Sequence, residues 1–306
     1  MERKDHIDLF GAASLTGFAL FLAVNQIIIK FVNQGLQPVF FAGARSLIGL
    51  VALTIWMIWR GHAFRFDRCY LLPGLAMGLA FSAEFLLLFI ALDLTTVSHA
   101  SILLYSMPVW LTIGAHFLLP GERINPLKAL GLVAAFSGVA WALMDRGAGQ
   151  AEGQVSLLGD LCALLASWGW VSITLLARGT RLREVRPEMQ LFWQVAVSGP
   201  VLLLAAMFFG PLVRDLAPIH LAGLFYQGIV VVAAGFAFWF WLLSIYPAAS
   251  VASFSFLSPI FGVLLGWLIL SEPVGPATLV SAALVAVGII LINRPASKPS
   301  ATSPKG

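Results

Sequence analysis

An acidic side chain, Glu84, stands inside an apolar stretch that reads FSAEFLLLF. A charge within a long apolar segment is costly, so it is usually kept for a ligand, a transferred proton or a polar partner on a neighbouring segment. As a carboxylate, Glu84 could bind an ammonium group or cycle a proton. The alternative is a structural role beside a polar group of another helix. Phe81 lies one turn before Glu84 and is a candidate ligand contact with it.

Two basic side chains also fall in or beside apolar stretches. His99 stands where such a stretch begins, and a histidine there could titrate near neutral pH and gate the mouth of a cavity. Its alternative is a hydrated residue at a helix end. Arg45 lies within a span, and we expect it to bond carbonyls or an acidic group of a neighbouring helix.

Polar and aromatic side chains supply the other candidate contacts. Asn25 is an uncharged polar group in an apolar segment and needs a partner from another helix or from a ligand. Four aromatic residues fall at comparable depth in their segments: Tyr105, Trp168, Trp239 and Phe254. Together they would form an aromatic cavity for an apolar solute, with cation–π attraction for an ammonium group. The alternative is ordinary helix packing.

Motifs for covalent chemistry are missing from the sequence. It has no paired-carboxylate spacing, no nucleophile with a neighbouring base and no Walker-type loop for ATP. The two cysteines, Cys69 and Cys162, lack metal-ligand spacing. We therefore expect no enzyme, no cofactor and no metal, and any work against a gradient must draw on another gradient.

The elements that must position these residues are membrane spans. Hydrophobic residues make up 60% of the 306 positions and charged residues only 10%, whereas soluble domains are about 25% charged. The net charge of +4 does not indicate nucleic acid, because the basic residues are spread through loops. The sequence predicts ten spans of about 20 residues in a lipid bilayer. They are 9–30, 37–59, 71–92, 96–119, 126–144, 157–178, 188–209, 218–242, 247–270 and 275–293.

An internal repeat relates the two halves of the chain. Pro108 and Pro259 lie 151 positions apart, each within a long apolar segment, and Pro126 and Pro276 lie 150 apart. These constant spacings indicate that about half of the chain is duplicated. A proline inside a helix removes one N–H donor and kinks the helix, and paired broken helices in two halves indicate a central transport site. We therefore predict that Pro108 and Pro259 act in gating.

The positions of lysine and arginine predict the orientation of the chain. Fourteen of the 18 fall on one side of the predicted spans, three on the other and one within a span. Both termini should then be cytoplasmic, and five spans per half make the halves inverted. We expect a first repeat at 1–145, a second at 146–293 with an outside connection at 145–156, and a disordered tail at 294–306.

The sequence resembles the drug/metabolite transporter superfamily, in its ten-helix branch with two EamA-type repeats. The resemblance covers about residues 9–293. In the first half its matching features are NQIIIK at Asn25–Lys30, Pro38 with Arg45, Ala91–Leu92, Ser98–Ala100, Ser106 with Pro108, LLPGER ending at Arg123, and GLVAAFSGVA. In the second half they are Asp160 with ALLASWGW, Ala248–Val251, Leu257 with Pro259, LSEP ending at Pro273, and Gly288.

The resemblance implies a fold in which helices 1, 3, 4, 6, 8 and 9 surround a central cavity. It also implies a secondary transporter of the bacterial inner membrane that exports small amphipathic metabolites by alternating access. Aromatic and other apolar amino acids are the expected substrates, and the protein is expected to work as a monomer. Two alternatives stay open: a drug or nucleoside exporter, and a membrane scaffold without flux.

Overall fold

The computed structural model describes residues 7–119, 124–144, 156–246 and 254–293. Four sequence features lie outside these ranges: LLPGER from Pro120 to Arg123, the connection at 145–155, the segment Ala248–Val251, and the tail from 294. Within the described ranges the regular elements are helices, apart from one isolated bridge between Leu36 and Val213. The predicted all-α fold is confirmed.

Ten apolar helical segments make up the described structure. Nine are long and apolar enough to cross a membrane, and the tenth, Phe254–Leu270, is shorter. The first-half helices are α1 (Leu9–Val32), α2 (Pro38–Trp59), α3 (Arg68–Leu94), α4 (Val97–Leu104) continuing as α5 (Met107–Leu118), and α6 (Pro126–Met144). The second-half helices are α7 (Leu157–Gly179), α8 (Pro187–Ala206), α9 (Pro218–Phe225) continuing as η2 (Tyr226–Gly235) and α10 (Phe236–Ile245), η3 (Phe254–Phe256) continuing as α12 (Leu257–Leu270), and α13 (Pro276–Asn293), with a short η1 (Arg181–Glu184) between α7 and α8.

Prolines mark where several helices begin. Helices α2, α6, α9 and α13 start at Pro38, Pro126, Pro218 and Pro276. The first turn of a helix leaves its N–H groups unpaired, so a residue without an N–H loses nothing there. Side-chain caps add to this signal: the Gln37 side chain accepts a hydrogen bond from the N–H of Phe40 at 2.7 Å.

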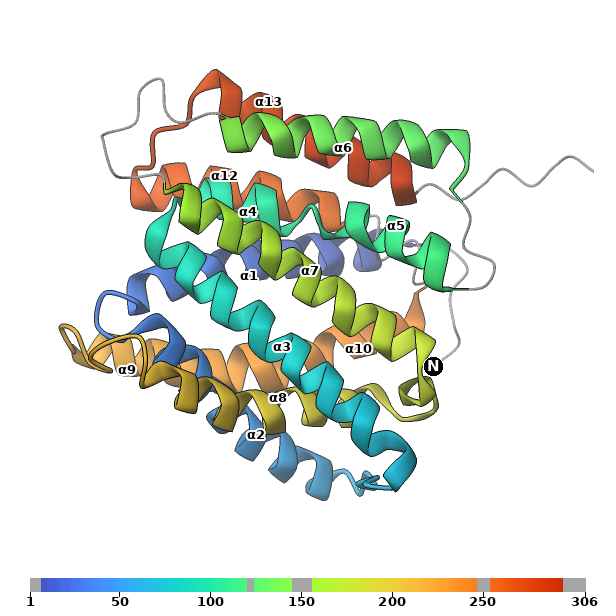
Figure 1. Cartoon of the computed structure of the whole chain (residues 1–306), viewed down its shortest axis with the longest axis vertical. Coiled ribbons are helices and arrows are strands. Elements are labelled where there is room, and N and C mark those ends of the chain that lie inside the picture. Colours follow the sequence, from blue (N-terminus) through green and yellow to red (C-terminus); the bar gives the residue numbers. More distant parts are fainter. Residues whose placement is uncertain (1–6, 120–123, 145–155, 247–253, 294–306) are drawn as a thin grey trace, which may run out of the picture.

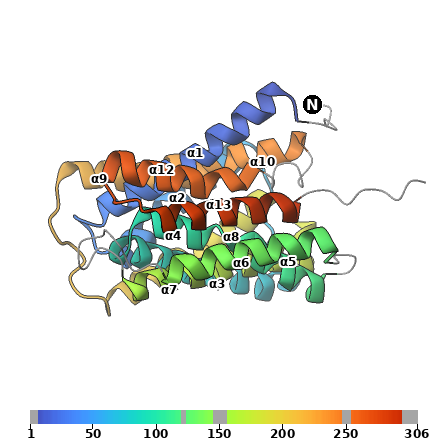
Figure 2. The ribbon, with the colours of Figure 1, turned by 90° about the horizontal axis from the view of Figure 1, so that it is seen from above.

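Corresponding spans of the two halves pack against each other. The last spans, α6 and α13, form one edge of the bundle, and α2 lies near the opposite edge beside α8 (Figure 1). Helix α3 packs on α7, and α12 packs on both α1 and α4. The helices run between two opposite ends of the molecule, which is also seen after a 90° turn (Figure 2). Because each half has five spans, the first half begins at one end of the bundle and the second half begins at the opposite end.

Glycines set the distance between several of these helices. A Cβ on Gly74 would lie 2.5 Å from the ring of Trp193, and one on Gly78 would lie 2.4 Å from Cβ of Val197. Gly74 and Gly78 therefore let α3 approach α8 closely, in the spacing that membrane helices use for tight packing.

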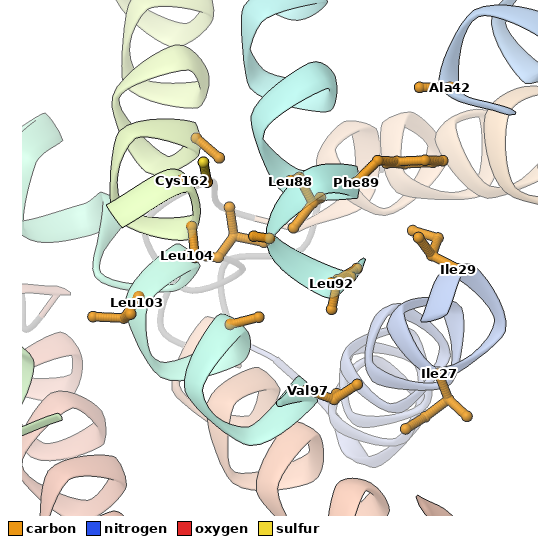
Figure 3. Packing of buried hydrophobic residues seen from close by; sticks show 14 of the residues in the cluster. Ile27, Ile29, Ala42, Leu88, Phe89, Leu92, Val97, Leu103, Leu104 and Cys162 are labelled. Carbon is orange, nitrogen blue, oxygen red and sulfur yellow. The ribbon is translucent and has the colours of Figure 1, made fainter. Parts of the chain in front are cut away.

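The largest buried apolar cluster lies at the end of the bundle away from the N-terminus, here called the far side. It joins the last turns of α1 and α3 to α4 and the first turns of α7 (Figure 3). Leu88, Leu104 and Cys162 meet there, with Leu92 and Val97 nearby. Because close-packed side chains leave no room for water, this cluster closes the bundle on the far side.

The predicted break at Pro108 is present in the structure, whereas before Pro259 the described residues begin only at Phe254. The fourth span ends its first piece, α4, at Leu104, and α5 begins at Met107 with Pro108 in its first turn. In the second half, the 3₁₀ turn η3 precedes α12, whose third residue is Pro259. A break that the prolines do not explain is η2, ten residues of π-helix in the middle of the eighth span.

The packing at Gly78 gives a first testable expectation. Gly78→Ala places a methyl group against Val197 and the backbone oxygen of Trp193, and such overpacking destabilises by about 1–3 kcal/mol. We expect a lower apparent melting temperature for the detergent-solubilised protein.

Gly17→Ala is the matched control, because nothing lies within 4 Å of a Cβ at Gly17. Equal melting temperatures for the two variants would contradict the assigned close contact between α3 and α8.

Candidate functional site

A cavity of about 220 Å³ lies between the two halves, toward the end of the bundle where the chain begins, here called the N-terminal side. Its walls come from the first half of α1, the break between α4 and α5, the middle of α7, η2 and α10, and the paired ends of η3, α12 and α13. These are the spans 1, 4, 6, 8, 9 and 10. The cavity is therefore built around both proline breaks.

Aromatic side chains are prominent in the cavity wall. Tyr105, Trp239 and Phe254, which the sequence predicted, line it together with Pro108. The other aromatic residues of the wall are Phe18, Phe21, Trp170 and Phe236. The Phe18 and Trp239 rings stack with centroids 5.0 Å apart, and those of Tyr105 and Trp170 are 6.3 Å apart.

The polar groups of the wall are few and uncharged in the part of the chain that the structure describes. They are Tyr105, Thr112, Ser255, Ser258 and Asn293. The Tyr105 hydroxyl interacts electrostatically with the side chains of Ser258 and of Gln26 on α1. Ligand sites combine apolar walls with a small number of placed polar groups, and this cavity has that character.

Trp170 lines the cavity, in place of the predicted Trp168. Trp168 is 46% exposed and packs edge-on against Trp110, on the outer face of α7. Two residues on, and more than half a turn around the helix, Trp170 faces the cavity. Depth in a span therefore indicates which part of a helix can contribute an aromatic contact, but the face of the helix decides which tryptophan lines the cavity.

Glu84 lies behind α7 and does not line the cavity. A Cβ on Gly169 would be 2.8 Å from Cβ of Glu84, so α7 passes directly over this residue. Phe81 is buried in the same face of α3. The resemblance implied that the third span borders the cavity, whereas the structure gives that place to α13.

Arg45 is the nearest cation to Glu84, and the two interact electrostatically in a fully buried setting. The Arg45 guanidinium stacks on the ring of Phe85 at 3.9 Å and donates to the Gln227 side-chain oxygen at 3.2 Å. Its Nε and one terminal nitrogen have no hydrogen-bond partner among the described residues. Arg45 and Glu84 thus attract each other across neighbouring helices without forming a direct ion pair among the described residues.

Gln227 carries this polar network across to α1. Its amide nitrogen donates to the Asn25 side-chain oxygen, while Gln26 accepts from the Ser101 hydroxyl at 2.7 Å. Asn25 is therefore buried against Gln227 and does not line the cavity. Sequence reasoning missed Gln227, which sits at the start of the π-helix; π-helical turns often mark functional sites, but no residue pattern in this segment announces one.

His99 is buried on the far side and is held by Asp160 of α7. The Nδ1 atom of His99 is 3.2 Å from one Asp160 oxygen, and the Thr95 hydroxyl donates to the other at 2.7 Å. Burial excludes the hydrated alternative for His99. Nearby, Arg214 in the loop before α9 donates to both oxygens of Asp93, in the last turn of α3, at 2.7 and 2.9 Å, and these hydrogen bonds raise the pKa of Arg214.

Comparison with known proteins places this architecture in a family. The model of the EamA-like transporter family matches residues 9–144 and 157–294. The chain belongs to this family. As an EamA-like transporter, it is a multi-pass membrane protein that carries a small-molecule substrate across a lipid bilayer.

Individual relatives match over nearly their whole length. The chain is 27% identical to "Uncharacterized transporter YvbV" of Bacillus subtilis (strain 168), covering 92% of this chain and 91% of that one. It is 24% identical to "Probable amino-acid metabolite efflux pump" of Escherichia coli (strain K12), over 95% of each. One crystal structure matches with a TM-score of 0.63 at 21% identity, over 92% of this chain and 98% of that one, which supports the fold.

The buried charges give a second testable expectation for this EamA-like transporter. Arg45→Met removes the buried cation that attracts Glu84, and removing one partner of a buried charge pair destabilises by up to about 3–5 kcal/mol. We expect a large fall in the apparent melting temperature, most of which the double variant Arg45→Met/Glu84→Gln regains.

The measurement is thermal unfolding of the purified variants in one detergent, with Glu84→Gln as the matching single change. Additive losses in the double variant would contradict the electrostatic pairing.

Proposed function

We propose that this transporter exports small amphipathic metabolites, with aromatic and other apolar amino acids as the preferred class. The observation that carries the proposal is the cavity, which is small, mostly apolar with seven aromatic side chains among its lining residues, and has a few uncharged polar groups. Its rings suit an apolar side chain, and they attract an ammonium group through cation–π contact. The printed name of the Escherichia coli relative supports the same class.

Tyr105, Trp239 and Phe254 are the proposed substrate contacts from the sequence, and Trp170 joins them. Asn25, Phe81 and Glu84 act one layer behind: through Gln227 and Arg45 they fix the walls that face the substrate. Trp168 is left out of the contact set because its ring faces away from the cavity. The hydroxyls of Tyr105 and Ser258 are the groups that would orient the polar end of a substrate.

Transport is proposed to follow alternating access between the two halves. With lysine and arginine concentrated on the N-terminal side, that side is cytoplasmic, and the protein stands in the bacterial inner membrane with both termini inside. The cavity then lies toward the cytoplasm while the apolar cluster closes the far side. Pro108 and Pro259, at the two breaks, are the proposed hinges, and His99 belongs to the closed side. The working unit is proposed to be the monomer.

A drug or a nucleoside is the rival substrate class. No charged side chain is among the cavity-lining residues that the structure describes, and an uncharged solute would suit such walls equally. Uptake into proteoliposomes separates the two classes when phenylalanine, tryptophan, methionine and leucine are compared with a nucleoside and a cationic drug, each with and without a pH gradient. A scaffold without flux would transport none of them.

The aromatic wall gives the third testable expectation. Trp239→Ala and Trp170→Ala each remove a ring that contacts the solute, and aromatic contacts contribute about 0.5–1.5 kcal/mol beyond area burial. We expect the apparent KM for the best amino-acid substrate to rise roughly two- to tenfold, with an unchanged amount of folded protein.

Trp141→Ala is the matched control, because Trp141 lies half exposed on α6 away from the cavity. If the two cavity variants transport with the KM of the Trp141 variant, the aromatic wall is not where the substrate binds.

A further inference from the structure

The carboxylate of Glu272, in the second half of the chain, is seated on the N-terminus of α4, in the first half. One of its oxygens accepts the N–H of Val97 at 2.6 Å. The other accepts both the N–H and the hydroxyl of Ser98, at 3.0 and 2.8 Å. The first N–H groups of a helix lack partners within the helix and form its positive end, so a carboxylate is a favourable partner for them. Glu272 is 6% exposed, so water hardly competes for it.

A helix normally takes such a cap from its own chain, just before its first turn. Helix α4 has one cap of this kind, because the Thr96 hydroxyl oxygen accepts the N–H of His99 at 3.1 Å. The N–H groups of Val97 and Ser98 are left to Glu272, 175 and 174 positions away. These hydrogen bonds therefore tie the two halves of the transporter together on the far side.

The backbone around Glu272 is shaped to deliver this carboxylate. Helix α12 ends at Leu270, and the next residue, Ser271, has a left-handed φ of 53°. The N–H of Glu272 then donates back to the Gly266 carbonyl at 3.1 Å. A Cβ on Gly266 would lie 2.4 Å from the Glu272 carboxylate and 2.8 Å from the Ser98 hydroxyl. The glycine thus leaves the space in which the two side chains meet.

Other charged groups hold the same end of α4. The Lys30 ammonium of α1 donates to the Thr95 carbonyl, and its charge attracts Glu272 and Asp93. Asp160 of α7 binds Thr95 and His99. The far-side end of α4 is therefore fixed by α1, by α7 and by the turn between α12 and α13.

The opposite end of α4 faces the cavity. Tyr105 follows its last residue and lines the cavity wall. One short helix therefore connects the Glu272 contact on the far side to the substrate contact at the break.

We propose that Glu272 is the latch of the far-side gate: a positioning residue that holds α4 in the conformation closed on that side. Opening the far side separates α4 from α12, so the Val97 and Ser98 N–H groups must leave the carboxylate. The inference rests on the proposed function, because a gate has a role only in transport. The contact between Glu272 and α4 itself does not depend on a substrate.

The two native cysteines make the latch measurable without a substrate. Cys162 is buried in the far-side cluster beside Leu88 and Leu104 (Figure 3). Cys69 lies at the N-terminal-side end of α3. In a Cys69→Ser background, Cys162 is the one remaining thiol, and its rate of reaction with a maleimide reports opening of the far side. The protein is placed in nanodiscs, where both faces meet the reagent.

Glu272→Gln keeps the shape of the side chain but turns an amide toward backbone N–H groups. Loss of a helix cap shifts a two-state equilibrium roughly five- to thirtyfold, and we expect the Cys162 labelling rate to rise by that factor. Ser98→Ala removes one of the three hydrogen bonds and should give a smaller rise. Asp215→Asn, at an exposed carboxylate in the loop before α9, is the matched control and should label at the wild-type rate.

Labelling of Cys69 in a Cys162→Ser background separates opening from general loosening. The latch predicts an unchanged Cys69 rate in the Glu272→Gln variant. An equal rise at both cysteines, or no rise at Cys162, would overturn the latch. Because no substrate enters this assay, a failed flux experiment would count against the proposed function and leave this result standing.

Discussion

The absence of water from the hydrocarbon core is the constraint on which this structure depends. Every backbone N–H and C=O group within the bilayer must find its partner inside the protein. Helices satisfy that demand, so each break in a helix has to be closed by other parts of the chain. The break after Leu104 is closed by Ser106, whose backbone N–H and hydroxyl both donate to the Leu103 carbonyl. Irregular backbone is tolerated where it borders a cavity, and the candidate site lies at such a place.

Buried polar side chains follow the same constraint. Glu84, Arg45, Gln227 and Asn25 come from four different spans and interact with one another along a line that runs behind the cavity. Such a network costs free energy wherever it is incomplete. Its members therefore fix the packing of α1, α2, α3 and η2 against each other. Their charged side chains lie behind the cavity, whose described lining residues are uncharged.

Much of the fold was predictable because its signals are local. Ten apolar segments, prolines at several helix starts and the two prolines inside apolar segments can all be read from residue type and spacing. Which side chain faces the cavity is not local. Trp168 and Trp170 differ by two positions, and only the packing of α7 on α3 through Gly169 decides between them. Glu84 was a reasonable candidate because burying a charge in a membrane span costs free energy. Its partner Arg45 lies on another helix, and a single sequence carries no signal for such a pairing.

The π-helical segment η2 has a consequence for the symmetry of the transporter. Its hydrogen bonds span five residues where those of an α-helix span four, so ten residues of η2 complete fewer turns. Side chains beyond it on α10, Trp239 among them, are rotated about the helix axis relative to an uninterrupted α-helix. The matching span α3 is α-helical from Arg68 to Leu94. Residues that match between the two halves at the same depth therefore point in different directions around their helices. For this reason the cavity between the two duplicated halves is asymmetric.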